Sequence, residues 1–246
     1  MHLLWPIRTE PPALEPDEAH VWAVPLDAES SQRQDCWATL SADERQRAND
    51  FRFDDPRRRF VGSRAALRTL LGKYLGERAE AIGFSIGPSG KPQLASGHAA
   101  WALRFNLSHS GDLALIAIAL GNEVGIDVEQ LRAVSHLEQI TKRYFHPDEA
   151  NEVLRAESDD LDQAFFRCWT AKEAVLKSIG SGVAGRLDAF RVPTAEHEPC
   201  WVDLRSAQIP NAARCWLQQL APCAGYVATV ASLDLERSAR CFAYSM

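Results

Sequence analysis

Two stretches of the chain place apolar residues three and four positions apart, which is the spacing of one helix face. The first runs from Asp54 to Leu75, where an aspartate cap and a first-turn proline open the helix and Gly76 follows its end. The second runs from about Asp159 to Ile179. Its aromatic residues recur at helical spacing and are interpreted as core: Phe165, Phe166 and Trp169. The pattern predicts two long helices, each with one buried face.

Other stretches show the apolar runs and alternation of strands. Leu103 to Leu107 and Leu113 to Leu120 flank a short polar segment, which predicts an antiparallel hairpin, and Val124 to Val128 follows as a third strand. Further strands are predicted at His20 to Leu26, Ile82 to Ile86, Trp201 to Leu204, Tyr226 to Val230 and Arg240 to Tyr244, with a short element at Ala213 to Leu220. Further helices are predicted from Ser41, where Glu44 completes a capping box, to about Asp50, from Val134 to Tyr144 and from Pro147 to Ala156.

Helix and sheet alternate twice along the chain, so we expect an α+β protein of two halves that meet near Gly121, residues 1–121 and residues 122–246. The length of 246 residues and the hydrophobic fraction of 46% suit one large domain or two modest ones. The six cysteines form no C-x-x-C pair, which favours reduced thiols over a zinc site or a disulfide framework. No apolar run is long enough for a signal peptide or a membrane span, so we predict a cytoplasmic protein with no membrane partner.

The net charge of −6 argues against a general affinity for nucleic acid. Nine of the 27 basic residues nevertheless lie between Arg45 and Lys73, which predicts one basic surface on an acidic molecule. A compact polyanion could dock there. The chain holds only five lysines, and three of them lie in segments that also carry candidate chemistry: Lys91, Lys172 and Lys177.

Three carboxylates form the first candidate site. Asp127 and Glu129 are two residues apart on a predicted strand, so both side chains leave the same face, where a hard divalent cation could bind. Glu173 on the second long helix could supply a third oxygen ligand. A solvated strand edge is the competing interpretation for the first two, and an ordinary helix ion pair with Lys177, worth about 0.2–0.5 kcal/mol, is the competing interpretation for Glu173.

Two polar turns are the other candidates. Ser108-His109-Ser110 in the hairpin connection is either plain turn chemistry or a set of donors for phosphate. A Ser-His-Asp triad is disfavoured because no Gly-x-Ser-x-Gly elbow occurs. Lys91 follows Gly90 in a turn, where it either is solvated or binds phosphate. Walker and Rossmann glycine patterns are absent from the sequence.

Taken together, four segments resemble the 4′-phosphopantetheinyl transferases, specifically the larger, monomeric type that activates peptide and polyketide synthases. The matching segments are Gly90-Lys91-Pro92, Phe105 to Ser110, Gly125 to Glu129 and Phe165 to Lys177. Their order and spacing are similar to the family over about Ser41 to Ile179. The resemblance implies two similar subdomains related by a pseudo-twofold axis, with coenzyme A bound between them.

The resemblance also implies roles for individual residues. Asp127, Glu129 and Glu173 would hold Mg²⁺ on the diphosphate of coenzyme A. Phosphate contacts are implied for Lys91, Ser108, His109, Lys172 and Lys177, and contacts with the adenosine 3′-phosphate for Arg47, Arg58 and Arg59. The first half would bind adenosine and the second would carry the metal ligands and the signature helix. One departure is Glu44, which stands where relatives often carry a lysine ahead of Arg47.

The implied reaction moves the phosphopantetheine arm of coenzyme A to a serine of an acyl or peptidyl carrier protein and releases adenosine 3′,5′-bisphosphate. Glu173, Glu129 and Lys177 are the predicted catalytic residues, and either glutamate could accept the serine proton. A monomer is expected because one chain would hold both halves of the cleft. Two other classes stay open, a magnesium-dependent phosphate-ester hydrolase and a noncatalytic module that binds coenzyme A or a carrier domain.

Overall fold

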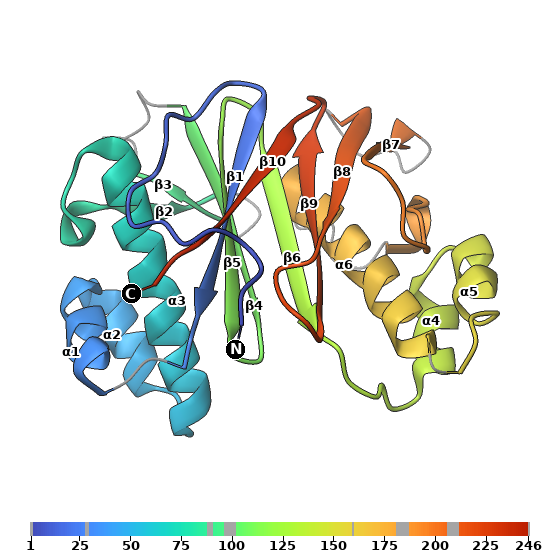
Figure 1. Ribbon diagram of the computed structural model, residues 1–246, viewed down its shortest axis with the longest axis horizontal. Coiled ribbons are helices and arrows are strands. Elements are labelled where there is room, and N and C mark those ends of the chain that lie inside the picture. Colours follow the sequence, from blue (N-terminus) through green and yellow to red (C-terminus); the bar gives the residue numbers. More distant parts are fainter. Residues whose placement is uncertain are drawn as a thin grey trace.

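The computed structural model describes residues 2–27, 30–87, 91–95, 102–158, 160–180, 187–205 and 212–245. It has a mixed α+β architecture in which each half of the molecule places one long helix on the outer face of a sheet (Figure 1). The two sheets face each other in the middle of the molecule. The predicted fold class, α+β with two similar halves, is therefore confirmed.

In the folded molecule, the first half is built on the sheet β10-β1-β5-β4, which includes the C-terminal strand β10 as well as three strands from residues 1–121. These strands are β1 (Glu18–Pro25), β4 (Leu103–Ser110), β5 (Leu113–Leu120) and β10 (Ser238–Ala243). Strands β1, β5 and β4 are antiparallel neighbours, whereas β10 runs parallel beside β1. The long helix α3 (Asp54–Leu75) covers this sheet. The smaller elements are α1 (Ser30–Thr39), α2 (Ala42–Asn49), the 3-10 turn η1 (Ala79–Ala81), β2 (Phe84–Ile86) and β3 (Pro92–Leu94).

The second half is built on the antiparallel sheet β6-β9-β8-β7. Its strands are β6 (Val124–Gln130), β7 (Cys200–Asp203), β8 (Arg214–Leu220) and β9 (Tyr226–Leu233). The long helix α6 (Leu161–Ile179) packs against β6 and β9. The remaining helical elements are α4 (Leu137–Tyr144), α5 (Pro147–Val153) and the 3-10 turn η3 (Leu187–Ala189).

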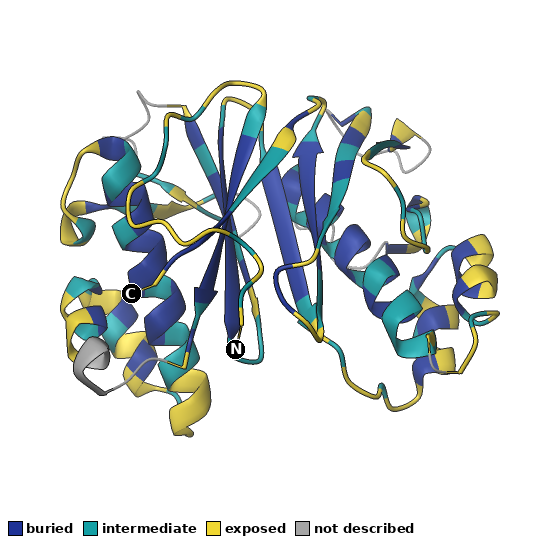
Figure 2. Ribbon diagram, viewed as in Figure 1, coloured by how far each residue is buried: buried dark blue, intermediate teal, exposed yellow. Residues whose placement is uncertain are grey.

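Three apolar clusters hold the layers together. One lies between α3 and the first sheet, a second lies between α6 and the second sheet, and a third joins the two sheets. Strand β5 is buried from Leu113 to Ala119 because α3 covers one of its faces and the second sheet covers the other (Figure 2). The third cluster therefore fixes the two halves against each other.

Most predicted elements agree with the structure, with shifts of a few residues at their ends. Helix α3 has the predicted bounds and ends at Gly76 in the left-handed conformation, with φ of 68°. Helix α1 was not predicted, and the short element before Leu220 is the full strand β8. The predicted turn from Gly87 to Pro92 includes three residues outside the described ones, 88–90. The division of the chain near residue 121 stays a prediction.

A membrane-spanning helix does not occur among the described residues, because none of their helices combines sufficient length with sufficient hydropathy.

Candidate functional site

The site lies where β4 of the first half meets β6 of the second. The two strands share no main-chain ladder, and polar side chains at alternate positions of β4 link them instead. The Asn106 side-chain oxygen accepts from the Ile126 N–H at 2.9 Å. The Ser108 hydroxyl donates to Asp127 at 2.8 Å, and the Ser110 hydroxyl donates to Glu129 at 2.6 Å. The two-residue period of both strands thus aligns two serines with the two acids.

Gly125 allows α6 to approach β6 at main-chain distance. A Cβ atom at this position would lie 2.0 Å from the Ala174 carbonyl oxygen and 2.5 Å from the Ser178 nitrogen. Such contacts are far inside van der Waals range, so a side chain here would push the helix away. The close approach places Glu173 and Lys177 of α6 beside the acids of β6.

Asp127 is the buried centre of the site, with 5% of its surface exposed. Its Oδ1 atom accepts from the Ser108 hydroxyl and from the Lys177 ammonium at 2.5 Å. Its Oδ2 atom is buried and has no hydrogen-bond partner among the residues that the structure describes. Burial raises the pKa of this carboxyl more than Lys177 and Ser108 lower it. A buried oxygen that lacks a partner is costly unless something else binds it.

Two further carboxylates surround Asp127. Glu129 accepts from Ser110 and from Arg132, the latter at 3.1 Å. Glu173 is half-buried, and its pKa is raised by burial and then by the negative charges of Asp127 and Glu129. The structure therefore brings the three predicted acids into mutual electrostatic contact. One ammonium group, that of Lys177, faces them.

The donor set suits a hard divalent cation, because carboxylate oxygens are the ligands that Mg²⁺ prefers and one of them is unsatisfied. Within the described ranges, however, no three His, Cys, Asp or Glu groups are already arranged to hold a metal ion. The Lys177 ammonium lies against Asp127 instead. The carboxylate oxygens are thus suitable ligands for Mg²⁺, and in this structure the Lys177 ammonium supplies the positive charge beside Asp127.

Lys172 is buried inside the second half, away from the place that a phosphate contact would require. Its side chain is 0% exposed and forms an ion pair with the equally buried Glu149 at 2.7 Å. The same ammonium donates to the carbonyl oxygens of Leu187 at 2.6 Å and Phe190 at 2.7 Å. All three of its donors are used inside the second half, so the prediction that it contacts a phosphate is corrected. Lys172 joins α6 to α5, to η3 and to Phe190, which follows η3.

Lys91 is also held by protein groups. Its ammonium donates to Glu123 at 2.7 Å, to the Val124 carbonyl at 3.1 Å and to the Lys177 carbonyl at 3.0 Å. Burial lowers its pKa more than Glu123 raises it. The structure places this lysine at the start of β6 and the end of α6, where it ties the two halves together, and does not bring it to the acids.

Arg58, Arg59 and His109 lie on the first-half side of the site. Both arginines bind Asp112 in the β4–β5 turn, at 2.9 and 3.0 Å. The pKa of His109 is lowered by its desolvation in the site and then by the charges of Lys177 and Arg59. His109 therefore lies close enough to both Lys177 and Arg59 for their charges to affect its protonation.

A cavity of about 650 Å³ opens beside this histidine. Arg47 lines the cavity, and its guanidinium lies 5.4 Å from the centre of the Phe60 ring. Glu44, Arg64 and Arg68 also line it, and sequence reasoning did not place these three together. Their spacings of 20 and 24 residues give no short-range pattern. Ser110 and Asn106 were likewise not predicted as links to β6, although their alternation along β4 is visible in the sequence.

Comparison with known proteins gives consistent matches along the chain. A family model described as "4′-phosphopantetheinyl transferase superfamily" matches residues 123–231, and one described as "4′-phosphopantetheinyl transferase, N-terminal" matches residues 27–120. The chain is 44% identical over 216 residues to the 4′-phosphopantetheinyl transferase HetI of Nostoc sp., covering 87% of both chains. It is 30% identical over 190 residues to the 4′-phosphopantetheinyl transferase Sfp of Bacillus subtilis, covering 66% of this chain and 80% of the relative.

A solved structure, the holo-[acyl-carrier-protein] synthase of Thermotoga maritima, is similar at a TM-score of 0.33 and 15% identity over 46% of this chain and 63% of that one. The sequence matches are far stronger. The chain belongs to the 4′-phosphopantetheinyl transferase family, and the predicted enzyme class is confirmed.

Proposed function

We propose that this protein transfers the 4′-phosphopantetheine arm of coenzyme A to a serine of an acyl or peptidyl carrier protein, with Mg²⁺ as cofactor and adenosine 3′,5′-bisphosphate as the second product. Relatives named as 4′-phosphopantetheinyl transferases support the transfer. The single observation that carries the site assignment is the unsatisfied Oδ2 atom of buried Asp127 between two further carboxylates.

Asp127, Glu129 and Glu173 would hold the metal ion. Bound there, Mg²⁺ would offset negative charge on the phosphate oxygens of the donor. The raised pKa values of Asp127 and Glu173 fit this role, because a cation stabilises the charged form that burial disfavours. The ion would also separate the Lys177 ammonium from its sole carboxylate partner among the described residues, Asp127.

Lys177, Ser108 and His109 would bind the phosphates. Lys177 donates to the Ser108 hydroxyl at 3.1 Å as well as to Asp127, so the ammonium group and the hydroxyl group lie next to each other beside Asp127. A phosphate oxygen beside Ser108 could accept from both of them. This arrangement would place stabilising charge on the group that is transferred.

Glu173 is the better placed of the two candidate bases. Its carboxylate is half-buried on α6 beside the two acids of β6, within the group of residues that would surround the donor phosphates. Glu129 already accepts hydrogen bonds from Ser110 and Arg132. We therefore assign proton removal from the carrier serine to Glu173 and a supporting metal contact to Glu129.

The cavity lined by Arg47 would receive the adenosine end of coenzyme A. It adjoins His109, so a nucleotide in the cavity would present its diphosphate to the acid cluster. Arg47 would contact the 3′-phosphate. Arg58 and Arg59 are bound to Asp112 and are not among the residues that line the cavity, so a contact with that phosphate would require them to leave Asp112. A cytoplasmic location and a monomeric state complete the proposal, which names no nucleic-acid or membrane partner.

Mass spectrometry of a carrier domain tests the reaction. The protein is incubated with coenzyme A, Mg²⁺ and an apo carrier domain, and the expected result is a mass gain of one phosphopantetheine arm at the carrier serine. A matched carrier with that serine replaced by alanine should gain nothing. Release of phosphate without any carrier modification would contradict the proposal and favour a hydrolase.

A further inference from the structure

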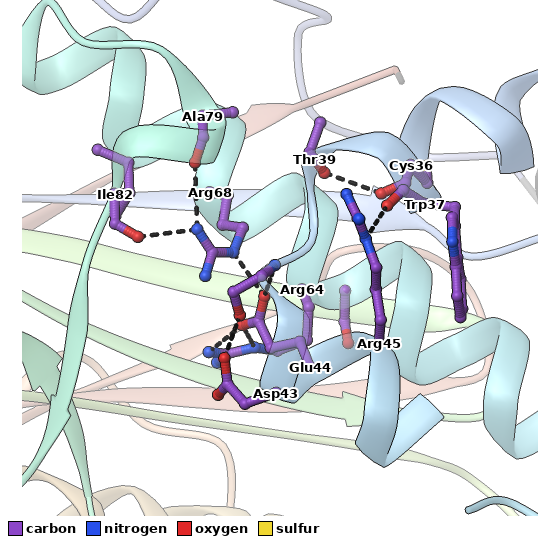
Figure 3. Close-up of polar contacts among 12 residues, drawn as sticks. Cys36, Trp37, Thr39, Asp43, Glu44, Arg45, Arg64, Arg68, Ala79 and Ile82 are labelled. Atoms are coloured by element: carbon purple, nitrogen blue, oxygen red, sulfur yellow. Dashed lines mark hydrogen bonds and ion pairs between the residues drawn. The ribbon is translucent and has the colours of Figure 1, made fainter. Parts of the chain in front are cut away.

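The cavity beside His109 is unusual in having an internal negative charge among its arginines. Arg47, Arg64 and Arg68 all line it, and so does Glu44. Glu44 is 5% exposed, and its Oε1 atom accepts from Arg64 at 2.6 Å while its Oε2 atom accepts from Arg68 at 2.6 Å (Figure 3). Its Oε2 atom also accepts from the Ser41 N–H at 3.1 Å, which caps α2.

The two arginines differ in how they depend on Glu44. Arg68 is buried and donates further to the Ala79 carbonyl at 3.2 Å and the Ile82 carbonyl at 2.8 Å, so it is held by the η1 turn as well (Figure 3). The Arg64 side chain is 14% exposed toward the cavity, and its one carboxylate partner among the described residues is Glu44. Its guanidinium also lies 4.7 Å from the centre of the Phe84 ring.

Arg47 lacks an ion-pair partner in the described part of the chain, and its guanidinium lies over Phe60. The cavity therefore presents one arginine without an ion pair among the described residues, and two arginines, Arg64 and Arg68, that share the single negative charge of Glu44. The attraction is strong, because Arg64 and Arg68 lower the pKa of Glu44 although burial would raise it. Glu44 is thus charged near neutral pH and subtracts one unit from the positive charge offered to a ligand.

We propose that Glu44 is a selectivity residue for the nucleotide end of the donor. By offsetting the charge of Arg64, it reduces the preference of the cavity for a ribose that carries a phosphomonoester over a ribose with a free hydroxyl at the same carbon. This inference rests on the proposed function, because it takes coenzyme A as the occupant of the cavity. It adds a residue that sets how strongly coenzyme A is distinguished from 3′-dephospho-coenzyme A.

The expected size follows from one unit charge. A unit charge about 6 Å from a phosphate dianion, in a dielectric close to that of water, changes the affinity by roughly tenfold. Glu44→Gln should therefore raise the preference for coenzyme A over 3′-dephospho-coenzyme A about tenfold. Arg64→Gln should lower the same preference about tenfold, because it removes one unit of positive charge while Glu44 keeps its own charge and its ion pair with Arg68. The double variant, Glu44→Gln with Arg64→Gln, should restore the wild-type preference.

The experiment measures KM for both donors with one carrier domain, in the full-length protein. Binding of adenosine 3′,5′-bisphosphate and of adenosine 5′-phosphate, measured by calorimetry, gives the same ratio without catalysis. Asp43→Asn is the matched control, since Asp43 lies next to Glu44 on α2, also lines the cavity and pairs with the Ser41 hydroxyl rather than with an arginine. Its exposed charge is screened by solvent, so the ratio should change less than about twofold.

Three outcomes would overturn the inference: an unchanged ratio in Glu44→Gln, an equal change in Asp43→Asn, or a double variant that keeps the ratio of either single variant. If Glu44→Gln does not fold, Arg64→Gln and the double variant still decide, because direct phosphate binding by Arg64 would leave the double variant as weak as the single one. A wild-type protein that modifies no carrier with either donor would contradict the proposed function instead, and the calorimetric ratio would still test Glu44.

Discussion

Replacement of Lys172 by methionine is the sharpest test of how the site is supported. The substitution keeps the length and most of the volume of the side chain but removes its charge. It leaves the Glu149 carboxylate in a fully buried position without its cation, and it leaves the carbonyl oxygens of Leu187 and Phe190 without their donor. A lysine that contacts substrate phosphate would have no such consequence for the folded state.

The magnitude follows from the burial of both partners. Breaking a fully buried ion pair by removing one partner costs about 3–5 kcal/mol, because the remaining charge is desolvated and unpaired. Glu149 keeps two main-chain donors, the Val192 N–H at 2.6 Å and the His146 N–H at 2.8 Å, which limit the loss toward the lower end of that range. We therefore expect Lys172→Met to lower the free energy of unfolding by about 3 kcal/mol.

Urea denaturation followed by tryptophan fluorescence measures this loss. Lys177→Met is the comparison variant on the same helix. The Lys177 side chain is 28% exposed, so we expect its replacement to cost less stability than Lys172→Met although its partner Asp127 is buried, while it weakens coenzyme A binding. The double variant Lys172→Met with Glu149→Gln should recover at least about 1 kcal/mol, since no buried charge remains. A stability loss below about 1 kcal/mol in Lys172→Met, together with weakened coenzyme A binding, would refute the structural role and restore the phosphate contact.

Three other predictions address the site itself. Glu173→Gln should reduce the rate of carrier modification by at least about a hundredfold with an unchanged unfolding midpoint, and near-normal turnover would remove Glu173 as the base. Gly125→Ala should separate α6 from β6, which should lower the stability by about 1–3 kcal/mol and also lower the Mg²⁺ affinity. The control Gly121→Ala has open space around its Cβ position and should leave the Mg²⁺ affinity unchanged. Equal Mg²⁺ affinities in the two variants would contradict the role of the close approach. Because the pKa values of Asp127 and Glu173 are raised, the folded protein should be stabilised as the pH falls through them, and Mg²⁺ binding should release protons there. Calorimetry in buffers of different ionisation enthalpy detects this release, and a buffer-independent heat would refute it.

The sequence was most informative where one local pattern decides the structure. Helix α3 has an apolar face, a first-turn proline and a terminal glycine within a single segment, and its predicted bounds are confirmed. The capping box of α2 is likewise local, because Glu44 reaches back to the main chain of Ser41. The three acids were assigned from the two-residue period of a strand and the resemblance of the neighbouring helix to a known family, and the structure brings them together.

Long-range pairing accounts for what the sequence did not indicate. Lys172 appeared chemical because it stands next to Glu173, but successive residues of a helix point about 100° apart, and its actual partner Glu149 lies on a different helix. Glu44 was visible as a departure from the family, yet its partners on α3 are 20 and 24 residues away. No periodicity within one element reports such contacts.

The parallel pairing of β10 with β1 has a consequence for how the polypeptide is assembled in the cell. These strands are separated by more than 200 residues, so β1 emerges from the ribosome long before the neighbour that covers one of its edges. Until then, that edge exposes unpaired amide and carbonyl groups that can recruit a strand from another nascent molecule. The first sheet is therefore complete only after the rest of the chain has been translated. A reporter protein fused after residue 121 would follow a sheet in which this edge of β1 is still open.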